Sequence, residues 1–328
     1  MRILVTGGGG FIGLALVRRL VEEGHDVSSF SRKEYSEHQP LGVKSICGDI
    51  ADFEDTVEAC RGMEVVFHVA GKVGVWGSHS EFYRNNVLGT QNMIRSCLQQ
   101  GVHTLIFTSS ASVIFGGDHL EGVDESHPYP ESPASGYSST KAQAEQVVLN
   151  ANSEQLRTIS LRPHIVWGPG DTQLTPKIIE RARSGKLRRP GKKDYLIDIT
   201  YIDNLIDAQL LALKKLGESK EVCGRAFFVT DGEPVKTWEF INAIIENAGI
   251  QMVHKSFPRS VALFAAWWME LFYRLSGKKE EPMITRFIVK ELSTHHWFDI
   301  SAAKNELGYF PRIHFREGME RISSAFSP

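Results

Sequence analysis

The chain has 328 residues, of which 42% are hydrophobic and 23% are charged. This composition is that of a globular protein with a sizeable core, and it excludes disorder as the main mode of action. The 37 Lys and Arg against 39 Asp and Glu leave a net charge of −2, so the chain as a whole lacks the basic surface of a nucleic-acid-binding protein. The length predicts about two domains.

Cysteine spacing and hydropathy favour a reduced, cytoplasmic protein. The four cysteines, which are far apart in the sequence, are Cys47, Cys60, Cys97 and Cys223. We therefore expect small buried thiols, no disulfide and no bound metal. The apolar N-terminus is too short for a secretory signal and instead predicts a strand. The sequence has no run of about 20 apolar residues, the length that a membrane span needs.

The N-terminal segment predicts a strand, a glycine turn and a helix. After a short apolar run, Gly7, Gly10 and Gly13 stand at three-residue spacing before a helical pattern. Glycines in this context make a tight turn, leave bare backbone for a pyrophosphate and let the helix pack closely on the sheet. The helix N-terminus favours phosphate. We therefore predict a dinucleotide site here, with Phe11 and Ile12 among its residues.

The end of the second predicted strand, residues 26–30, favours NADP(H) over NAD(H). An acid at this point would hold the ribose 2′-hydroxyl, but the chain has Ser31, Arg32 and Lys33. A hydroxyl and a guanidinium can bind a 2′-phosphate, which a carboxylate would repel. The alternative interpretation is that Arg32 and Lys33 are solvated loop residues.

Further strand-like runs alternate with helical stretches, at residues 44–47, 65–69, 105–108 and 158–161. This alternation predicts an α/β fold with a doubly wound parallel Rossmann sheet. After Arg162 prolines become frequent, which predicts a smaller, mostly helical C-terminal substrate lobe. We expect the dinucleotide-binding domain at 1–167, with 195–230 rejoining it, and the lobe at 168–194 and 231–328.

Tyr137 and Lys141 lie one helical turn apart in a predicted helix. An ammonium at this spacing stabilises a phenolate and lowers a pKa that is otherwise about 10, which suits proton transfer. Because a Tyr four residues before a Lys also occurs by chance, the other motifs decide the interpretation.

Together the motifs resemble the extended short-chain dehydrogenase/reductase family. The matching segments are Gly7-x-x-Gly10-x-x-Gly13, Gly48–Ile50, His68–Gly71, Asn86–Thr90, Ser109–Val113, Tyr137-x-x-x-Lys141 and Arg162–Pro163. The resemblance implies that Tyr137 is the acid/base, that Lys141 lowers its pKa and holds the nicotinamide ribose, and that Ser110 bonds the reacting oxygen. It also implies a homodimer, paired through helices after Ser80 and Tyr137.

By the same resemblance, Asn86 supports its helix and a proton relay. Cofactor-lining positions are Asp49, Ile50, Val69, Ala70, Gly71, Lys141 and Pro163. Simpler interpretations are that Ser110 only ends a strand and that Asn86 only caps a helix.

The segments 108–116 and 161–171 resemble the 3β-hydroxysteroid dehydrogenase branch, nearest to sterol-4-carboxylate 3-dehydrogenases and bacterial 2-alkyl-3-oxoalkanoate reductases. Family epimerases have polar anchors where this chain has Ile165 and Ile197, which favours an apolar substrate. The resulting hypothesis is an NAD(P)-dependent oxidoreductase that interconverts a secondary alcohol and a ketone on a bulky apolar substrate, either a β-hydroxy/β-keto acid or a 3β-hydroxysterol. The alternatives are a nucleotide-sugar epimerase and a non-catalytic NADP-binding sensor, which would not need Tyr137.

Other segments suggest substrate and surface contacts. Residues 261–275 predict an amphipathic helix that roofs an apolar pocket or rests on a membrane, with core packing as the alternative. His164 or Arg84 could bind a carboxylate, and Trp76 and Phe82 could line the pocket. The run 181–193 has seven Lys or Arg, which suit an anionic lipid, a carrier or a partner enzyme, or are simply solvated.

Overall fold

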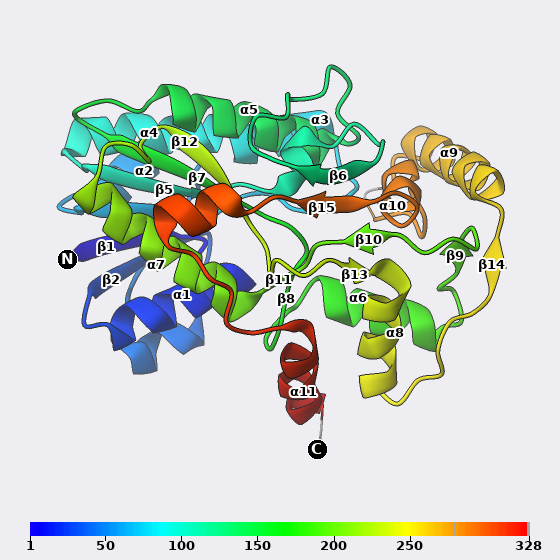
Figure 1. The fold of residues 1–328 in the computed structure, drawn as a ribbon. Helices are drawn as coiled ribbons and strands as arrows, with labels where there is room; N and C mark the ends of the chain where they lie inside the picture. The colour runs from blue at the N-terminus through cyan, green and yellow to red at the C-terminus, as the bar shows by residue number, and fades with distance from the viewer. Residues whose placement is uncertain (279, 327–328) are drawn as a thin grey trace.

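The computed structural model describes residues 1–278 and 280–326. Its centre is a seven-stranded parallel sheet in the order β12-β7-β5-β4-β1-β2-β3 (Figure 1). The strands are β1 (Arg2–Thr6), β2 (Asp26–Ser31), β3 (Lys44–Cys47), β4 (Val65–His68), β5 (Thr104–Thr108), β7 (Arg157–Pro163) and β12 (Arg225–Val229). This order confirms the predicted doubly wound Rossmann sheet.

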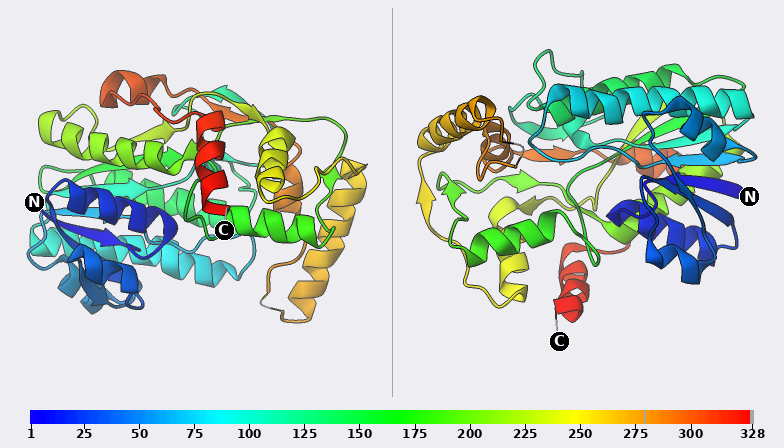
Figure 2. Two further views of the ribbon diagram at one scale, coloured as in Figure 1. Left: turned by 90° about the horizontal axis from the view of Figure 1, so that it is seen from below. Right: turned by 180° about the vertical axis from the view of Figure 1, so that it is seen from behind.

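Helices cover both faces of the sheet (Figures 1 and 2). One face carries α2 (Phe53–Cys60), α4 (Gly89–Gln100) and α5 (Gly136–Asn150), and the other carries α1 (Phe11–Glu22) and α7 (Ile202–Glu218). Side chains of a strand alternate between faces. Accordingly Ile3 and Val5 of β1 pack in the core that includes α1, whereas Leu4 packs in the core that includes α2 and α4.

A smaller lobe lies beyond the carboxyl ends of the strands (Figure 1). Its helices are α6 (Leu174–Arg183), α8 (Thr237–Asn247), α9 (Arg259–Leu275), α10 (Arg286–Glu291) and α11 (Phe315–Phe326). Its small sheet has the order β13 (Val235–Lys236), β10 (Leu196–Ile197), β15 (His296–Phe298), β6 (Leu120–Val123). Two further pairs are β8 (Val166–Trp167) with β11 (Thr200–Tyr201), and β9 (Arg189–Pro190) with β14 (Ser256–Phe257).

The chain crosses between the two parts more than once. β12 returns to the main sheet beside β7, whereas β6 leaves residues 1–167 to join the small sheet of the lobe. The exact domain boundaries stay a prediction.

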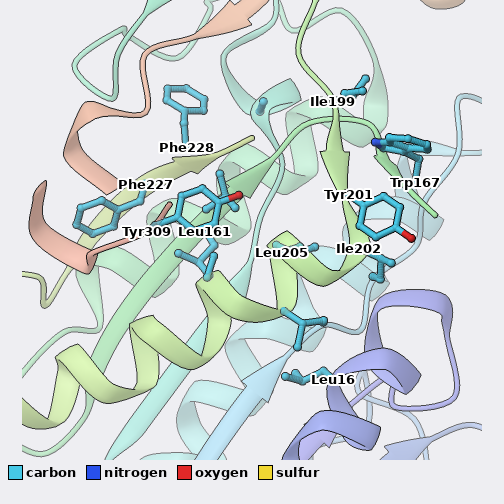
Figure 3. Close-up of a cluster of buried hydrophobic side chains, with 14 of the residues drawn as sticks. Leu16, Leu161, Trp167, Ile199, Tyr201, Ile202, Leu205, Phe227, Phe228 and Tyr309 are labelled. Atoms are coloured by element: carbon cyan, nitrogen blue, oxygen red, sulfur yellow. The ribbon is translucent and has the colours of Figure 1, made fainter. Parts of the chain in front are cut away.

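One hydrophobic core joins the sheet, α1, α7 and the C-terminal segments (Figure 3). Trp167 and Tyr201 are fully buried and meet edge to face, with ring centroids 5.2 Å apart. Trp167 also donates its indole N–H to Asp231, at 3.4 Å. Because this core includes residues of both parts, the lobe is held on the sheet by shared apolar packing.

The four cysteines are free. Cys60 and Cys97 are buried and Cys223 is half-buried, but Cys47 is exposed. The expectation of a buried thiol is wrong at Cys47, because this residue ends β3, the edge strand of the sheet. Within residues 1–278 and 280–326, no helix has the length and apolar character that crossing a membrane requires.

Candidate active site

The glycine turn after β1 depends on close backbone contacts. Gly7 has a left-handed φ of 71° and donates its N–H to Phe30 O at 2.8 Å. A Cβ at Gly7 would lie 3.0 Å from Ala70 Cα, and a Cβ at Gly13 would lie 2.1 Å from Gly7 O. Side chains at these positions would push the turn away from β4 and from α1, so glycine is required for close packing.

Gly10 is different, because its missing side chain leaves an open cradle. A Cβ there would meet only Gly7 O, at 3.3 Å, among atoms within 4 Å in the described chain. Gly10 caps α1, and Phe11 and Ile12 are the first residues of this helix. The first N–H groups of a helix lack intrahelical partners and favour anions. The turn therefore fits the pyrophosphate of a nicotinamide dinucleotide.

Polar side chains gather where β2 and β3 end. Ser31 has a buried hydroxyl without a hydrogen-bond partner in the described chain, and Arg32 is exposed. Burial acts to raise the pKa of Asp49, but hydrogen bonds from Ala51 N–H and Arg84, with the Arg84 and Arg32 charges, lower it overall. Ser31, Arg32 and Asp49 thus come together as the dinucleotide hypothesis requires.

Two other predicted cofactor segments follow β3 and β4. Ile50 is buried against Gly89, and its carbonyl accepts from Asn92 at 3.1 Å. Val69, Ala70 and Gly71 follow β4, and Ala70 N–H donates to Thr6 Oγ1 at 3.0 Å. The end of β4 is therefore tied to the end of β1, where the glycine turn begins.

Tyr137 lies in the first turn of α5, which Ser135 caps by accepting from Ser138 N–H at 3.0 Å. Burial raises the pKa of Tyr137, and a side-chain hydrogen bond with Ser110 opposes this shift. The structure therefore brings Tyr137 and Ser110 together, although Ser110 follows β5 and Tyr137 starts a helix. The net direction is opposite to the lowering that the Tyr137–Lys141 spacing suggests, because removing the phenol from water disfavours its charged form.

Lys141 is 5% exposed and donates to Thr108 O at 2.6 Å. Its ammonium also lies 4.0 Å from the centroid of the Phe107 ring. Burial lowers the pKa of Lys141 to about 7. The ammonium is thus held at the carboxyl end of β5, and its proposed effect on the Tyr137 phenolate stays a prediction.

Ser110 and Asn86 both have structural partners. Ser110 caps the turn Ala111–Ile114, with its hydroxyl 3.0 Å from Ser112 Oγ. Asn86 lies inside the helical stretch that leads into α4, so it is not a helix-start cap. Its side chain accepts from Lys72 N–H at 2.7 Å and donates to Thr140 Oγ1 at 3.1 Å. Asn86 therefore joins the loop after β4 to α5, the helix of Tyr137.

A buried ion pair fixes α5 to β7. Arg162 donates to both Glu145 oxygens, with its shortest contact 2.8 Å long, and both side chains are almost fully buried. Tyr129 and Ser160 each donate to Glu145 at 2.7 Å. These bonds outweigh burial and keep the pKa of Glu145 below its usual value, so the charged pair persists.

A cavity of about 870 Å³ lies at the start of α5; Tyr137 and Ser110 are not among its lining residues. Its lining includes Gly136, the residue before Tyr137, and Phe82, whose ring lies 6.4 Å from the Tyr137 ring. Trp76 also lines it. Among the described residues, the same space is lined by the cationic side chains of Arg274, Lys278, Arg286 and Lys290 and by the carboxylates of Glu81 and Glu270. Lys290 has no local motif around it, so the sequence alone does not indicate that it belongs to a site.

The two residues expected to bind a carboxylate lie elsewhere. Arg84 forms an ion pair at 2.8 Å with Asp49, which follows β3. His164 is buried, and its Nε2 lacks a hydrogen-bond partner in the described chain. Neither lines the cavity. The assignment of a substrate carboxylate to Arg84 therefore conflicts with its position, because Asp49 already neutralises it.

His164 belongs to a cluster that sequence spacing could not show. Ligand-type atoms of His164, Glu291 and His296 lie within 4.8 Å of one another, although the residues are far apart in the chain. A second such group is exposed and joins His119, Glu121 and His295. The expectation of no bound metal rests on the spacing of the cysteines. It therefore does not apply to these two groups of histidine and glutamate side chains.

The loop after β7 carries backbone strain. Pro163 ends β7 opposite Val229 of β12, and Ile165 has a φ of 41°, which is rare for a β-branched residue. Ile197 of β10 is 2% exposed. Of the two positions expected to hold a polar anchor in an epimerase, that of Ile197 is therefore enclosed in an apolar core.

Comparisons with known proteins find relatives that match nearly the whole chain. Residues 4–259 match the model of the 3-beta hydroxysteroid dehydrogenase/isomerase family. A 2-alkyl-3-oxoalkanoate reductase of Stenotrophomonas maltophilia is 41% identical over 99% of both chains. A mouse decarboxylating sterol-4-alpha-carboxylate 3-dehydrogenase is 32% identical over 98% of this chain and 90% of its own.

Solved structures show the same fold. The Thermus thermophilus UDP-glucose 4-epimerase in complex with NAD superposes with a TM-score of 0.75, at 26% identity and 99% coverage of both chains. The family match spans most of the chain, and the relatives match nearly all of it. The chain belongs to the 3-beta hydroxysteroid dehydrogenase/isomerase family.

Proposed function

We propose that the protein is an NADP(H)-dependent reductase of α-branched β-keto acids with large apolar substituents, the class named in 2-alkyl-3-oxoalkanoate reductases. The observation that carries the proposal is the side-chain hydrogen bond between Tyr137 and Ser110, with a cavity next to it that Gly136, Phe82 and several cationic side chains line. A proton donor and a hydroxyl at one carbonyl oxygen suit ketone reduction. The 41% identity to such a reductase over the whole chain supports the substrate class.

The residues of the chain have separate roles in this reaction. Bound NADPH supplies the hydride to the carbonyl carbon. Tyr137 donates its phenolic proton to the substrate oxygen, and Ser110 donates a hydrogen bond to the same oxygen. Buried Lys141 ties α5 to the end of β5, and Asn86 ties α5 to the loop after β4, which fixes the helix that carries Tyr137.

The cofactor preference rests on the end of β2. A phosphate needs donors without competing carboxylates, and here Ser31 has an unpartnered buried hydroxyl beside exposed Arg32. Asp49 lies nearby but is already paired with Arg84, which neutralises it. These features support NADP(H) over NAD(H).

A nucleotide-sugar epimerase is the second candidate, favoured by the shared fold with UDP-glucose 4-epimerase. The aliphatic Ile197 in the apolar core argues against it, because a sugar diphosphate needs polar partners.

The test measures oxidation of NADPH and of NADH by the purified protein with a 2-alkyl-3-oxo acid. We expect NADPH consumption that Tyr137→Phe lowers by about 10² or more, because general acid catalysis is lost. The comparison substrates are a 3-hydroxysterol, assayed by reduction of NADP+ and NAD+, and UDP-glucose, whose redox-neutral epimerisation is followed by analysis of the sugar product. Turnover of UDP-glucose alone, or full activity of Tyr137→Phe, would contradict the proposal.

A further inference from the structure

The outer face of α9 carries an apolar stripe. Its members recur at spacings of three and four residues and therefore lie along one side of the helix; they are Val261, Phe264, Trp268, Phe272 and Leu275. All are exposed, from 51% at Trp268 to 80% at Leu275. Such a stripe is unusual on a solvent face and marks a contact surface.

The opposite face of α9 anchors the helix to the lobe. Ala262 and Ala266 are fully buried and pack with Val289 of α10. Glu270 forms an ion pair with Arg286 at 2.8 Å. Core packing therefore accounts for the inner face alone, and the outer stripe contributes nothing to it.

The basic run 181–193 lies next to the start of α9. β9, inside this run, pairs with β14, which leads directly into α9 (Figure 1). Arg189 N–H donates to Lys255 O at 3.1 Å, and Gly191 N–H donates to Phe257 O at 2.8 Å. Two segments that are far apart in the sequence thus form one edge of the molecule.

Most of the cations in this run are exposed and have no acidic partner in the part of the chain that the structure describes. Arg181 and Arg189 have acidic partners in Glu281 and Asp194. The other five members are exposed: Arg183, Lys186, Arg188, Lys192 and Lys193. The edge therefore combines aromatic side chains with a local excess of positive charge.

We propose that the stripe of α9 and the basic run together form a docking surface for an anionic lipid bilayer. Aromatic and aliphatic side chains on one helix face insert at the headgroup boundary, and neighbouring Lys and Arg bind anionic headgroups. Neither signal alone holds a protein firmly, but the β9–β14 pair places both on one edge. Tyr273 and Arg274 of the same helix line the cavity, so docking places the cavity next to the bilayer. Passage of an apolar substrate from the bilayer into the cavity is an inference that rests on the proposed function. The docking of the protein on the bilayer does not rest on it.

The experiment is vesicle co-sedimentation of the full chain with phosphatidylcholine alone and with added phosphatidylglycerol, at low and high salt. We expect binding to the anionic vesicles that falls at high salt. Phe264→Ser with Trp268→Ser should lower binding about tenfold or more, through lost apolar insertion. Arg188→Glu with Lys192→Glu should lower binding to anionic vesicles by a similar factor.

Matched variants control for exposure and charge. Phe310→Ser removes an aromatic side chain that is 66% exposed but lies away from α9, and Lys214→Glu with Lys220→Glu reverses two exposed charges elsewhere. Both should bind vesicles like the parent, and all variants should keep its thermal unfolding midpoint.

Three results would overturn the proposal: no binding of the parent protein to either vesicle, unchanged binding of the Phe264 and Trp268 variant, or a parent oligomer that this variant dissociates. The last result would assign the stripe to a second copy of the chain. Vesicle binding needs no substrate, so it fails or succeeds separately from the reductase assay.

Discussion

Single residues at the ends of β2 and β5, together with Tyr137 of α5, are central to the proposed chemistry. Ser31 is the last residue of β2, and Arg32 follows it. Thr108, whose carbonyl accepts from Lys141, ends β5, and Ser110 lies two residues further on. Local sequence was sufficient to find them, because each stands at a fixed offset from a strand or a glycine turn. Lys290 was not found this way, since only the tertiary structure brings α10 to the cavity.

Arg32 tests the cofactor preference. Arg32→Glu should raise KM for NADPH by about 10- to 100-fold, because a charge-assisted bond to the 2′-phosphate is worth about 1.5–3 kcal/mol. KM for NADH should change little. Lys44→Glu, at the opposite end of neighbouring β3, is the control. An equal loss with both cofactors would show that Arg32 does not read the 2′-phosphate.

Lys290 tests where a substrate carboxylate binds. Its ammonium lies 3.4 Å from Gly116 O on the loop that follows the Ser110 turn, and no carboxylate of residues 1–278 and 280–326 is within ion-pair distance. Lys290→Met should raise KM for the oxo acid about tenfold and leave its methyl ester unaffected, because only the acid loses a charged partner. Lys278→Met, at an exposed site of the same cavity, is the control. A matching loss for acid and ester would instead indicate a structural role.

At the scale of elements, the position of Tyr137 depends on how α5 is attached. The Glu145–Arg162 pair joins α5 to β7, and Asn86 joins α5 to the helix before α4. The sequence identified Arg162 only as a family landmark. Its partner Glu145 could not be inferred from spacing, because the two lie on different elements that meet only across the folded sheet.

Removing one partner of this pair should be costly. Glu145→Gln leaves the Arg162 guanidinium buried without its counter-charge, so we expect a loss of about 3–5 kcal/mol in the free energy of unfolding, measured with urea. Glu58→Gln removes half of an exposed pair with Arg61 and should cost at most about 1 kcal/mol. Similar losses for the two variants would mean that burial does not govern the strength of the pair.

At the scale of the whole molecule, the lobe is built from segments that leave and rejoin the sheet. β12 returns to pair with β7, and β6 contributes to the small sheet of the lobe. The homodimer and the cytoplasmic location stay predictions. Tyr83 and Leu98, 40% and 43% exposed along the stretch from α3 (His79–Phe82) to α4, are apolar side chains that a dimer contact there would cover.

The sequence by itself determined the Rossmann sheet, the glycine turn, Tyr137 with Lys141, and the family. These follow from periodicity and from motifs within a few residues, where local geometry governs the outcome. Tertiary structure alone decided that Arg84 neutralises Asp49, that Lys290 lines the cavity, and that the basic run lies beside α9. Each of these contacts joins residues distant in the chain, so their meeting depends on packing and loop closure rather than on local pattern.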